Sequence, residues 1–354
     1  MVPGIGNVNA KKLIAYCQGA EAVFHEKKER LLKIPGIGNK VVAQLHSNEF
    51  IDLAEQEIEF MQRNQIQGCY YLEDQYPYRL KHCEDGPIIL YTKGNFSLNP
   101  SKCVSVVGTR KATVKGRETC EKLIEELSVY QPTIISGLAY GIDIVAHKTS
   151  IRNHLETIAV MASGLDQIYP RLHEKTALAM QQKGGIISDY RSNSTILPVH
   201  FAERNRIVAG MADIVVVIES SLKGGSLITA DLANGYHRDV AAFPGRPSDS
   251  QSEGCNMLIK QNKAALVESA KDIAELMGWE ALNTSPKQTD LFVELSDEEQ
   301  LLVDHIKINN KMGLDELSLA VKMPISRTTA LLLSLEFKGV VKSLPGKIFQ
   351  LSRF

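Results

Sequence analysis

The chain has 354 residues, of which 44% are hydrophobic, and its 40 Lys and Arg almost balance its 41 Asp and Glu. This length predicts two or three domains with a real hydrophobic core. The net charge of −1 excludes a chain that attracts polyanions through its overall charge, so any nucleic-acid site must be a local concentration of Arg and Lys.

The cysteines and the hydropathy pattern exclude further classes of protein. The six cysteines form no CxxC pair and no cluster with histidine, which argues against a zinc site and against a disulfide framework and favours a reducing compartment. No apolar run is long enough to cross a bilayer, and the start lacks a signal-peptide pattern. We therefore expect a cytoplasmic protein with no membrane partner and no metal.

Residues 1–66 contain an internal repeat and are expected to form an all-α domain. The segment Val2–Asn7 returns as Ile34–Asn39, and each copy precedes a helix-like segment with lysine near its start. The two glycines of each copy permit a tight turn whose amides can bind a DNA phosphate. The pattern resembles a tandem helix-hairpin-helix unit of the SAM-like type. The alternative is a turn that only packs two helices together, which needs the same glycines. The segment has eight basic and eight acidic residues, so its charge does not decide whether it contacts DNA.

An α/β sheet is predicted over residues 67–280. Val104–Arg110 opens with an apolar, β-branched run that is typical of a buried strand, and Val114–Tyr130 has helical spacing of apolar residues. A second strand, Thr133–Ile135, leads through Ser136–Asp143 into another helix. Alternation of this kind predicts a doubly wound, parallel, Rossmann-like sheet. Later strands are expected at Thr157–Met161, Gly185–Ser188, Asp213–Ile218, Asp239–Phe243 and Ala264–Val267, with helices that include Leu227–Tyr236 and Ala270–Met277.

A tyrosine-rich region precedes this sheet. Its segments Tyr70–Leu72, Tyr76–Tyr78 and Pro87–Tyr91 are expected to form short strands and turns that lead into the sheet. The tyrosines either stack on bases or, as most half-buried tyrosines do, pack against the core.

The C-terminal part is expected to be a separate winged-helix domain. A polar, proline-containing segment at residues 281–290 predicts a linker, and residues 291–354 show the order helix, helix, helix, hairpin. Ser326–Thr329 would open the recognition helix. Eight basic and eight acidic residues leave open whether this domain binds DNA or protein. Its elements are expected at Asp297–Lys307, Gly313–Val321, Ser326–Lys338, Val340–Val341 and Ile348–Leu351.

Four loops should converge at the carboxyl edge of the sheet, where parallel α/β folds bind ligands. They offer close backbone approach at glycine, free amides at helix starts, planar guanidinium groups and one aromatic ring. Phe201 near two arginines is the combination that single-stranded nucleic acid needs. One such loop is usually only a turn, but four together favour a phosphate-bearing ligand. The candidate binding residues are Gly108, Thr109, Arg110, Lys111, Ser136, Gly137, Gly141, Phe201, Arg204, Asn205, Arg206, Gly225 and Ser226.

Catalysis is not indicated. Ser136, Asp143 and His147 permit a Ser/His/Asp interpretation, but no G-x-S-x-G elbow accompanies them, and the alternative is that Asp143 braces the loop while His147 packs locally. His200 either touches phosphate or is an ordinary surface histidine. No GxGxxG follows the first strand and no Walker lysine motif is present, which argues against a dinucleotide or nucleoside triphosphate. We expect no cofactor and no enzyme activity.

Taken together, the motifs resemble the DprA/Smf family, DNA-processing protein A. The stretches that match are Gly108–Arg110, Ser136–Asp143 with His147, Gly164–Asp166 with Tyr169–Pro170, Arg204–Gly210, Gly225–Ala230, Pro244–Gly245 and Gly254–Ile259. The resemblance implies an extended Rossmann-like domain that binds single-stranded DNA in a basic pocket. It also implies homodimerisation, protection of incoming DNA during natural transformation, and loading of the RecA recombinase.

The same resemblance implies roles for individual residues. Arg110 would hold phosphate, Phe201 would stack on a base, and Arg204 and Asn205 would line the pocket. The sequence departs from the family pattern at His173, where Asn is frequent, at Ser188–Tyr190, and at Glu203, which places an acid inside the pocket loop.

Two alternatives belong to other functional classes. One is a nucleotide phosphoribohydrolase of the lysine-decarboxylase-like group, whose Pro-Gly-Gly-x-Gly-Thr-x-x-Glu motif aligns with Lys223–Asp231. The second-half Gly, the Thr and the catalytic Glu are replaced here, so hydrolysis is not expected. The other is a structural adaptor that acts through its winged helix.

Overall fold

The structure, a computed structural model, describes residues 1–354 except 1, 3, 46–48, 282–294, 345–346 and 352–354. It divides into two compact units, Met1–Thr284 and Ser285–Phe354. The expected linker at 281–290 lies outside the described residues apart from Ala281. Across the described part of the chain, no helix is long and apolar enough to cross a membrane.

The first unit is built around a nine-stranded sheet with the order β1-β2-β6-β5-β4-β3-β7-β8-β9, counted over its described residues. The seven strands from β6 to β9 in this order are parallel, and β1 and β2 extend the sheet antiparallel. The strands are β1 (Gln67–Tyr70), β2 (Ile89–Asn95), β3 (Cys103–Val107), β4 (Thr133–Ser136), β5 (Thr157–Val160), β6 (Gly184–Ser188), β7 (Ile214–Val217), β8 (Asp239–Ala242) and β9 (Ala265–Leu266). The predicted extended Rossmann-like sheet is confirmed.

The chain winds in both directions from β3, because β4 pairs with one side of it and β7 with the other. Strand order therefore reverses between β3 and β7, and the loops after these two strands diverge to opposite faces. In open α/β sheets this switch point is where a crevice forms beyond the carboxyl ends of the strands. The topology alone thus indicates where a ligand site should be sought.

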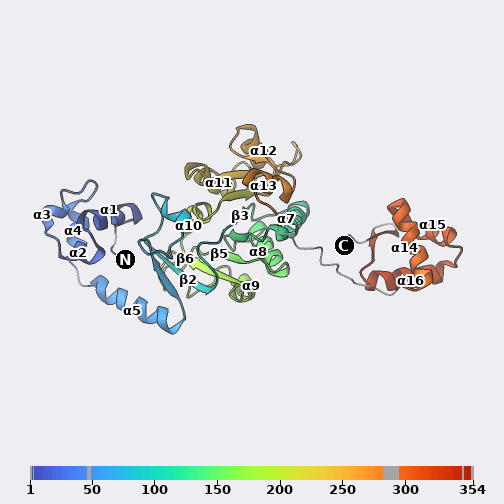
Figure 1. Ribbon diagram of the computed structural model, residues 1–354, viewed down its shortest axis with the longest axis horizontal. Coiled ribbons are helices and arrows are strands. Elements are labelled where there is room, and N and C mark those ends of the chain that lie inside the picture. The colour runs from blue at the N-terminus through green and yellow to red at the C-terminus, as the bar shows by residue number, and fades with distance from the viewer. Residues whose placement is uncertain (1, 3, 46–48, 282–294, 345–346, 352–354) are drawn as a thin grey trace. The chain divides into compact units, whose positions relative to one another are not determined.

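Helices cover both faces of the sheet. Val104 and Val106 pack on one face with α7 (Val114–Leu127), α8 (Ile142–Arg152) and α13 (Ala270–Met277). Val215 and Val217 face the other side, toward α10 (Pro198–Gly210), α11 (Gly225–Gly235) and α12 (Glu253–Lys260). Figure 1 shows α10 and α11 on one side of the strands, with α8 and α9 (Glu174–Met180) on the other. Burial on both faces explains why the parallel strands are continuous apolar runs.

One predicted loop is a helix. The segment Phe201–Arg206 was expected as a loop, but it forms the middle of α10. Pro198 occupies the first helical turn, where its missing N–H costs no bond, and Ile207 and Val208 bury the end of the helix in the core. The sequence does not show the apolar spacing of a helix here, because Glu203–Arg206 is a polar run and the buried residue within it, Arg204, is an arginine.

Over the described residues of this segment, five helices precede the sheet: α1 (Asn7–Cys17), α2 (Ala20–His25), α3 (Lys28–Leu31), α4 (Asn39–Leu45) and α5 (Glu49–Arg63). Gly4 and Gly36, the equivalent glycines of the repeat, have φ of +79° and +88°, which confirms the two predicted tight turns. The Lys11 ammonium donates to the carbonyls of Cys83 and Glu84 at 3.1 Å. These helices and the sheet therefore belong to one unit, and the boundary at residue 66 stays a prediction.

The tyrosine-rich region packs against the core. Tyr76 is fully buried and donates its hydroxyl to the Pro87 carbonyl at 2.6 Å. After it the chain forms a short helix, α6 (Tyr78–Lys81), where short strands and turns were predicted. Arg79 on this helix is buried and binds Asp213 at the start of β7, with Nε 2.6 Å from Oδ1 and Nη2 2.8 Å from Oδ2. This pair fixes α6 to the amino edge of the sheet.

The second unit confirms the winged-helix order. Its described helices are α14 (Asp297–Asn309), α15 (Leu314–Ala320) and α16 (Ile325–Phe337). A short strand that was not predicted, β10 (Lys311–Gly313), joins the hairpin of β11 (Val341–Leu344) and β12 (Ile348–Leu351) in the order β10-β12-β11. Arg327, at the start of α16, donates to the Glu298 carboxylate at 2.8 to 3.1 Å.

Acid should loosen this second unit, because a carboxylate holds two of its helices together. Glu299 accepts from Lys338 Nζ at 2.7 Å and from Ser334 Oγ at 2.8 Å, and these donors lower its pKa to about 2. A depressed folded-state pKa stabilises the fold above the ordinary value of 4.5 and less as the pH falls toward 2. Hydrogen exchange of α14 and α16 should report a loss on the order of 1 kcal/mol over this range. In Glu299→Gln this loss of stability at low pH should disappear. If it were unchanged, Glu299 would not be the group responsible.

Candidate nucleic-acid interface

A hollow lies at the switch point, between the loop after β3 and the helices α10 and α11. The loop supplies small residues and two exposed cations, Arg110 and Lys111, and α10 supplies one aromatic and several polar side chains. Nine of the thirteen candidate residues line this hollow: Gly108, Thr109, Arg110, Lys111, Phe201, Arg204, Asn205, Gly225 and Ser226. Gly137 lines an adjoining crevice that also contains Arg110 and Phe201.

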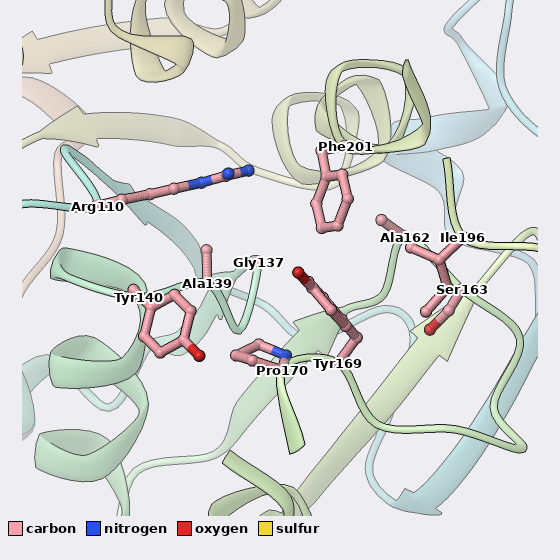
Figure 2. A pocket seen from close by; sticks show the side chains of 10 residues that line it. All are labelled: Arg110, Gly137, Ala139, Tyr140, Ala162, Ser163, Tyr169, Pro170, Ile196 and Phe201. Carbon is pink, nitrogen blue, oxygen red and sulfur yellow. The ribbon is translucent and has the colours of Figure 1, made fainter. Parts of the chain in front are cut away.

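The cation that lies over the Phe201 ring is Arg110, from the loop after β3, and not one of the two arginines near Phe201 in the sequence, Arg204 and Arg206. The Arg110 guanidinium carbon lies 5.1 Å from the centroid of the Phe201 ring. The centroid of the Tyr169 ring lies 5.5 Å from that of Phe201, and the two ring planes are tilted by 58°. Figure 2 shows Arg110 extended toward Phe201 and Tyr169 directed at the space between them, while Tyr140 lines the same crevice next to Pro170. A cation next to aromatic faces suits a ligand that has both phosphates and bases.

Tyr140 and Tyr169 were not among the candidate residues. Their side chains line the crevice and are 46% and 48% exposed, enough for a ring to be covered by a ligand. A sequence signal was present, because Tyr140 follows β4 and Tyr169 lies in the segment after β5, and both strands end at the edge that contains the site.

The helical geometry of α10 separates Arg206 from the other candidates. Phe201, Arg204 and Asn205 are spaced i, i+3, i+4 and share one face of the helix, whereas Arg206 is turned away. Its guanidinium pairs with the buried carboxylate of Asp189 and lines neither the hollow nor the crevice. Burial raises the pKa of Asp189 and the adjacent guanidinium opposes that rise. Arg206 therefore stabilises the fold beneath the site.

Arg204 lines the hollow but is itself buried. Its Nη1 donates to the Gly137 carbonyl at 2.6 Å and to the Val160 carbonyl, so that it joins α10 to the ends of β4 and β5. A Cβ at position 137 would lie 2.3 Å from Nη1, which explains the glycine there. Burial lowers the pKa of Arg204 and raises that of the nearby Asp143, whose carboxylate accepts from the Ala139 amide at 3.3 Å. Arg204 thus positions the loop after β4.

Ser136 and Gly141 lie beneath the surface of the site and line neither cavity. Ser136 is fully buried, and its hydroxyl donates to the Val106 carbonyl at 2.6 Å. Gly141 has φ of +79°, and a Cβ there would lie 2.1 Å from the Thr109 carbonyl oxygen. Glycine is required because the loops after β3 and β4 touch at this point.

The start of α11 faces the hollow, and over the described residues no side chain caps its first amide groups. Its N-cap residue, Gly224, has no side chain to occupy them, and a Cβ at Gly225 would meet nothing within 4 Å. Uncapped amides at a helix N-terminus attract anions. Asp231, which aligns with the hydrolase glutamate, pairs instead with Lys263 at 2.8 Å and does not line the hollow. This placement does not favour the phosphoribohydrolase alternative.

The Ser/His/Asp interpretation is not supported, because the Ser136 hydroxyl and the His147 ring have other partners. His147 Nδ1 lies 2.8 Å from the hydroxyl of Thr157, which itself donates to the Ile134 carbonyl, so Nδ1 is the donor. The hydroxyl of Ser136 is engaged by Val106 as described. His200 stacks on Tyr190, with 4.3 Å between ring centroids, and does not line the hollow.

Acidification should destabilise the first unit through His147. Burial lowers the pKa of this histidine from 6.5 to about 3, so the unfolded chain takes up a proton that the folded protein refuses. Stability should therefore fall as the pH drops from 6.5 toward 3, with a slope of up to about 1.4 kcal/mol per pH unit from this group. Urea unfolding followed by the fluorescence of the single tryptophan, Trp279, measures it. In His147→Asn the dependence of the unfolding free energy on pH should be weaker. An equal dependence in the variant and the natural chain would show that His147 is not the responsible group.

Comparisons with known proteins agree with this geometry. A family model described as DNA recombination-mediator protein A matches residues 67–278, and one described as the DprA winged helix domain matches residues 286–347. The DNA processing protein DprA of Streptococcus pneumoniae is 39% identical over 202 residues, which cover 57% of this chain and 71% of that protein. Protein Smf of Escherichia coli is 32% identical over 284 residues, which cover 78% and 75% of the two chains.

Two solved structures are similar as well. The X-ray structure of DprA from Streptococcus pneumoniae superposes with a TM-score of 0.65 at 32% identity and covers 78% of this chain and 99% of that one. A structure of DNA processing protein A from Helicobacter pylori, whose subject is its single-stranded DNA binding mode, superposes with a TM-score of 0.55 at 28% identity. It covers 61% of this chain and 98% of that one.

Proposed function

We propose, from the premise that this chain belongs to the DprA/Smf family of DNA-processing proteins, that it binds single-stranded DNA in the hollow and the adjoining crevice. The observation that supports this most is the position of the exposed Arg110 guanidinium over the Phe201 ring at the switch point. A phosphate can contact the cation while the neighbouring base stacks on the ring.

The distribution of charge supports a backbone-binding site. Arg110 and Lys111 are exposed at the rim, and neither side chain forms an ion pair with any residue that the structure describes. Arg204 and Asp143 are buried below and hold the loop in place. The cations available to a polyanion are therefore at the surface, while the buried charges form the scaffold.

We further propose, on the family resemblance, that the protein acts without catalysing a reaction. In this proposal it protects incoming DNA, loads the RecA recombinase onto the bound strand, and functions as a cytoplasmic homodimer. Incubation with nucleoside monophosphates tests the first point, since release of free base at a catalytic rate would contradict it. RecA filament assembly on oligonucleotides coated with a single-strand-binding protein tests the loading step, which requires faster assembly when the protein is added.

Arg110→Ala should weaken binding to a thymidine oligonucleotide and make it less sensitive to salt. Each phosphate contact that is lost reduces the slope of log K against log salt concentration by about 0.7 for a single strand. Fluorescence anisotropy at several salt concentrations measures both quantities, and duplex DNA of the same length is the comparison. Arg152→Ala is the matched control, because Arg152 is an exposed arginine at the far end of α8, where it pairs with Glu125. Unchanged affinity and slope in Arg110→Ala would remove this site from consideration.

A further inference from the structure

A second groove lies on the same edge of the sheet, beyond the ends of β7 and β8. Its walls are the start of α7, the residues after β7 and the turn after β8. Phe243 and Pro244 provide an apolar surface within it, and Phe243 is only partly buried. We call it the β8 groove; its lining residues are Thr113, Lys115, Gly116, Thr119, Ile218, Glu219, Phe243, Pro244, Gly245, Arg246, Asp249 and Ser252.

In the β8 groove the carboxylates accept hydrogen bonds from the protein, whereas the cations do not pair with any part of it that the structure describes. Glu219 accepts from the amide and hydroxyl of Thr113 at 2.9 and 2.7 Å, and Asp249 accepts from the amide of Gln251 and the hydroxyl of Ser252. Lys115 and Arg246 are both exposed, and over the described residues their side chains form no ion pair and no hydrogen bond. The carboxylates are thus engaged by the protein, whereas the cations are available to an anion.

The β8 groove adjoins the hollow through a thin wall. The Thr109 amide donates to the Glu219 carbonyl at 2.7 Å, and the Thr109 hydroxyl donates to Gln251 at 3.1 Å. Thr109 and Gln251 line the hollow, while the side chain of Glu219 lines the groove. Exposed cations thus line both sides of this wall, Arg110 and Lys111 in the hollow and Lys115 and Arg246 in the groove.

From these contacts we infer that the β8 groove is a second segment of the single-stranded DNA site. A strand whose bases stack in the hollow continues past Lys111, places phosphates at Lys115 and Arg246, and lays a base on Phe243. An open groove with separated, exposed cations suits a polyanion with repeated charges better than a small enclosed ligand. This inference rests on the proposed function and adds to it the path and the length of strand that the protein holds.

The test compares oligonucleotide lengths. Thymidine oligonucleotides of about 6 and about 20 nucleotides lie below and above the span of one such site. Lys115→Gln with Arg246→Gln should leave the affinity for the short oligonucleotide unchanged. For the long one, affinity should fall roughly tenfold to thirtyfold near 0.1 M salt, and the salt slope should decrease by about 1.4, as two lost contacts require. Lys122→Gln, on the same helix but paired with Glu126, is the control and should change neither value.

Cross-linking provides an independent readout. Iodouracil-substituted long oligonucleotides should form a photo-adduct on Phe243, and that adduct should disappear in the double variant. Equal losses for both lengths, or no loss with the long oligonucleotide and no adduct on Phe243, would overturn the inference. Failure of the proposed function is distinguishable, because in that case Arg110→Ala would also leave binding of the short oligonucleotide unchanged.

Discussion

Arg79→Ala should lower the free energy of unfolding of the first unit by about 3–5 kcal/mol, the largest effect on stability expected for a single side chain here. The substitution leaves the Asp213 carboxylate near the amino edge of β7 without its main partner. Among the residues that the structure describes, the Asp213 carboxylate would retain one donor, the Cys103 amide at 2.8 Å. The same guanidinium donates to the carbonyls of Pro100 and Ser101, so that loop is released too. Urea unfolding followed by Trp279 fluorescence measures the change.

An exposed arginine provides the matched control for this prediction. Arg63 pairs with Glu59 at 3.0 Å within α5, and both side chains are well exposed. Arg63→Ala should therefore cost no more than about 0.5 kcal/mol. If Arg79→Ala proved as mild as Arg63→Ala, the pair of Arg79 with Asp213 would not be what fixes α6 to the sheet.

Phe201→Ala should reduce the affinity for single-stranded DNA by about 1–3 kcal/mol, roughly 5- to 150-fold, because it removes the ring on which a base would stack. The ring also supports the Arg110 guanidinium from 5.1 Å, so its loss affects the phosphate contact as well. The salt slope should change less than the affinity, since no cation is removed. Anisotropy titrations with a short thymidine oligonucleotide measure both quantities.

Two variants separate stacking from general destabilisation. Phe201→Tyr keeps an aromatic face and should retain most of the affinity. Phe24 on α2 is 42% exposed, so Phe24→Ala removes an exposed ring far from the site in sequence and should leave binding unchanged. A loss in Phe201→Tyr as large as in Phe201→Ala would show that stacking is not the contribution of this residue.

The sheet was predictable because its strands are short apolar runs between glycine-containing turns. Val104–Val107 and Ile214–Val217 are buried on both faces, so burial itself selects the residues from which the strands are recognised. Strand order has no such local signal, and the pairing of β3 with β7 follows only from the assembled fold. The convergence of the loops after β3 and β4 followed from the parallel topology alone.

The failures in the site have a common physical origin. In α10 the buried side is occupied by Arg204, whose guanidinium is satisfied by carbonyls of distant strands, so the helix lacks an aliphatic stripe. Arg206 was grouped with its neighbours because a loop would have allowed it, whereas a helix turns it toward Asp189. Asp213, bound by Arg79 from 134 residues earlier in the chain, belongs to the same class of long-range polar pairs.

The clamp made by Arg204 has a thermodynamic consequence. The loop after β4 is held by Arg204 at Gly137, by His173 Nδ1 at the Leu138 carbonyl and by Asp143 at the Ala139 amide. In the proposed complex, this loop is thus held in place by the protein's own hydrogen bonds before any ligand arrives. Association then costs little conformational entropy on the protein side, and the ordering cost falls mainly on the flexible nucleotide chain. Calorimetry with oligonucleotides of different flexibility should therefore show lower affinity for strands that lose more conformational entropy on binding.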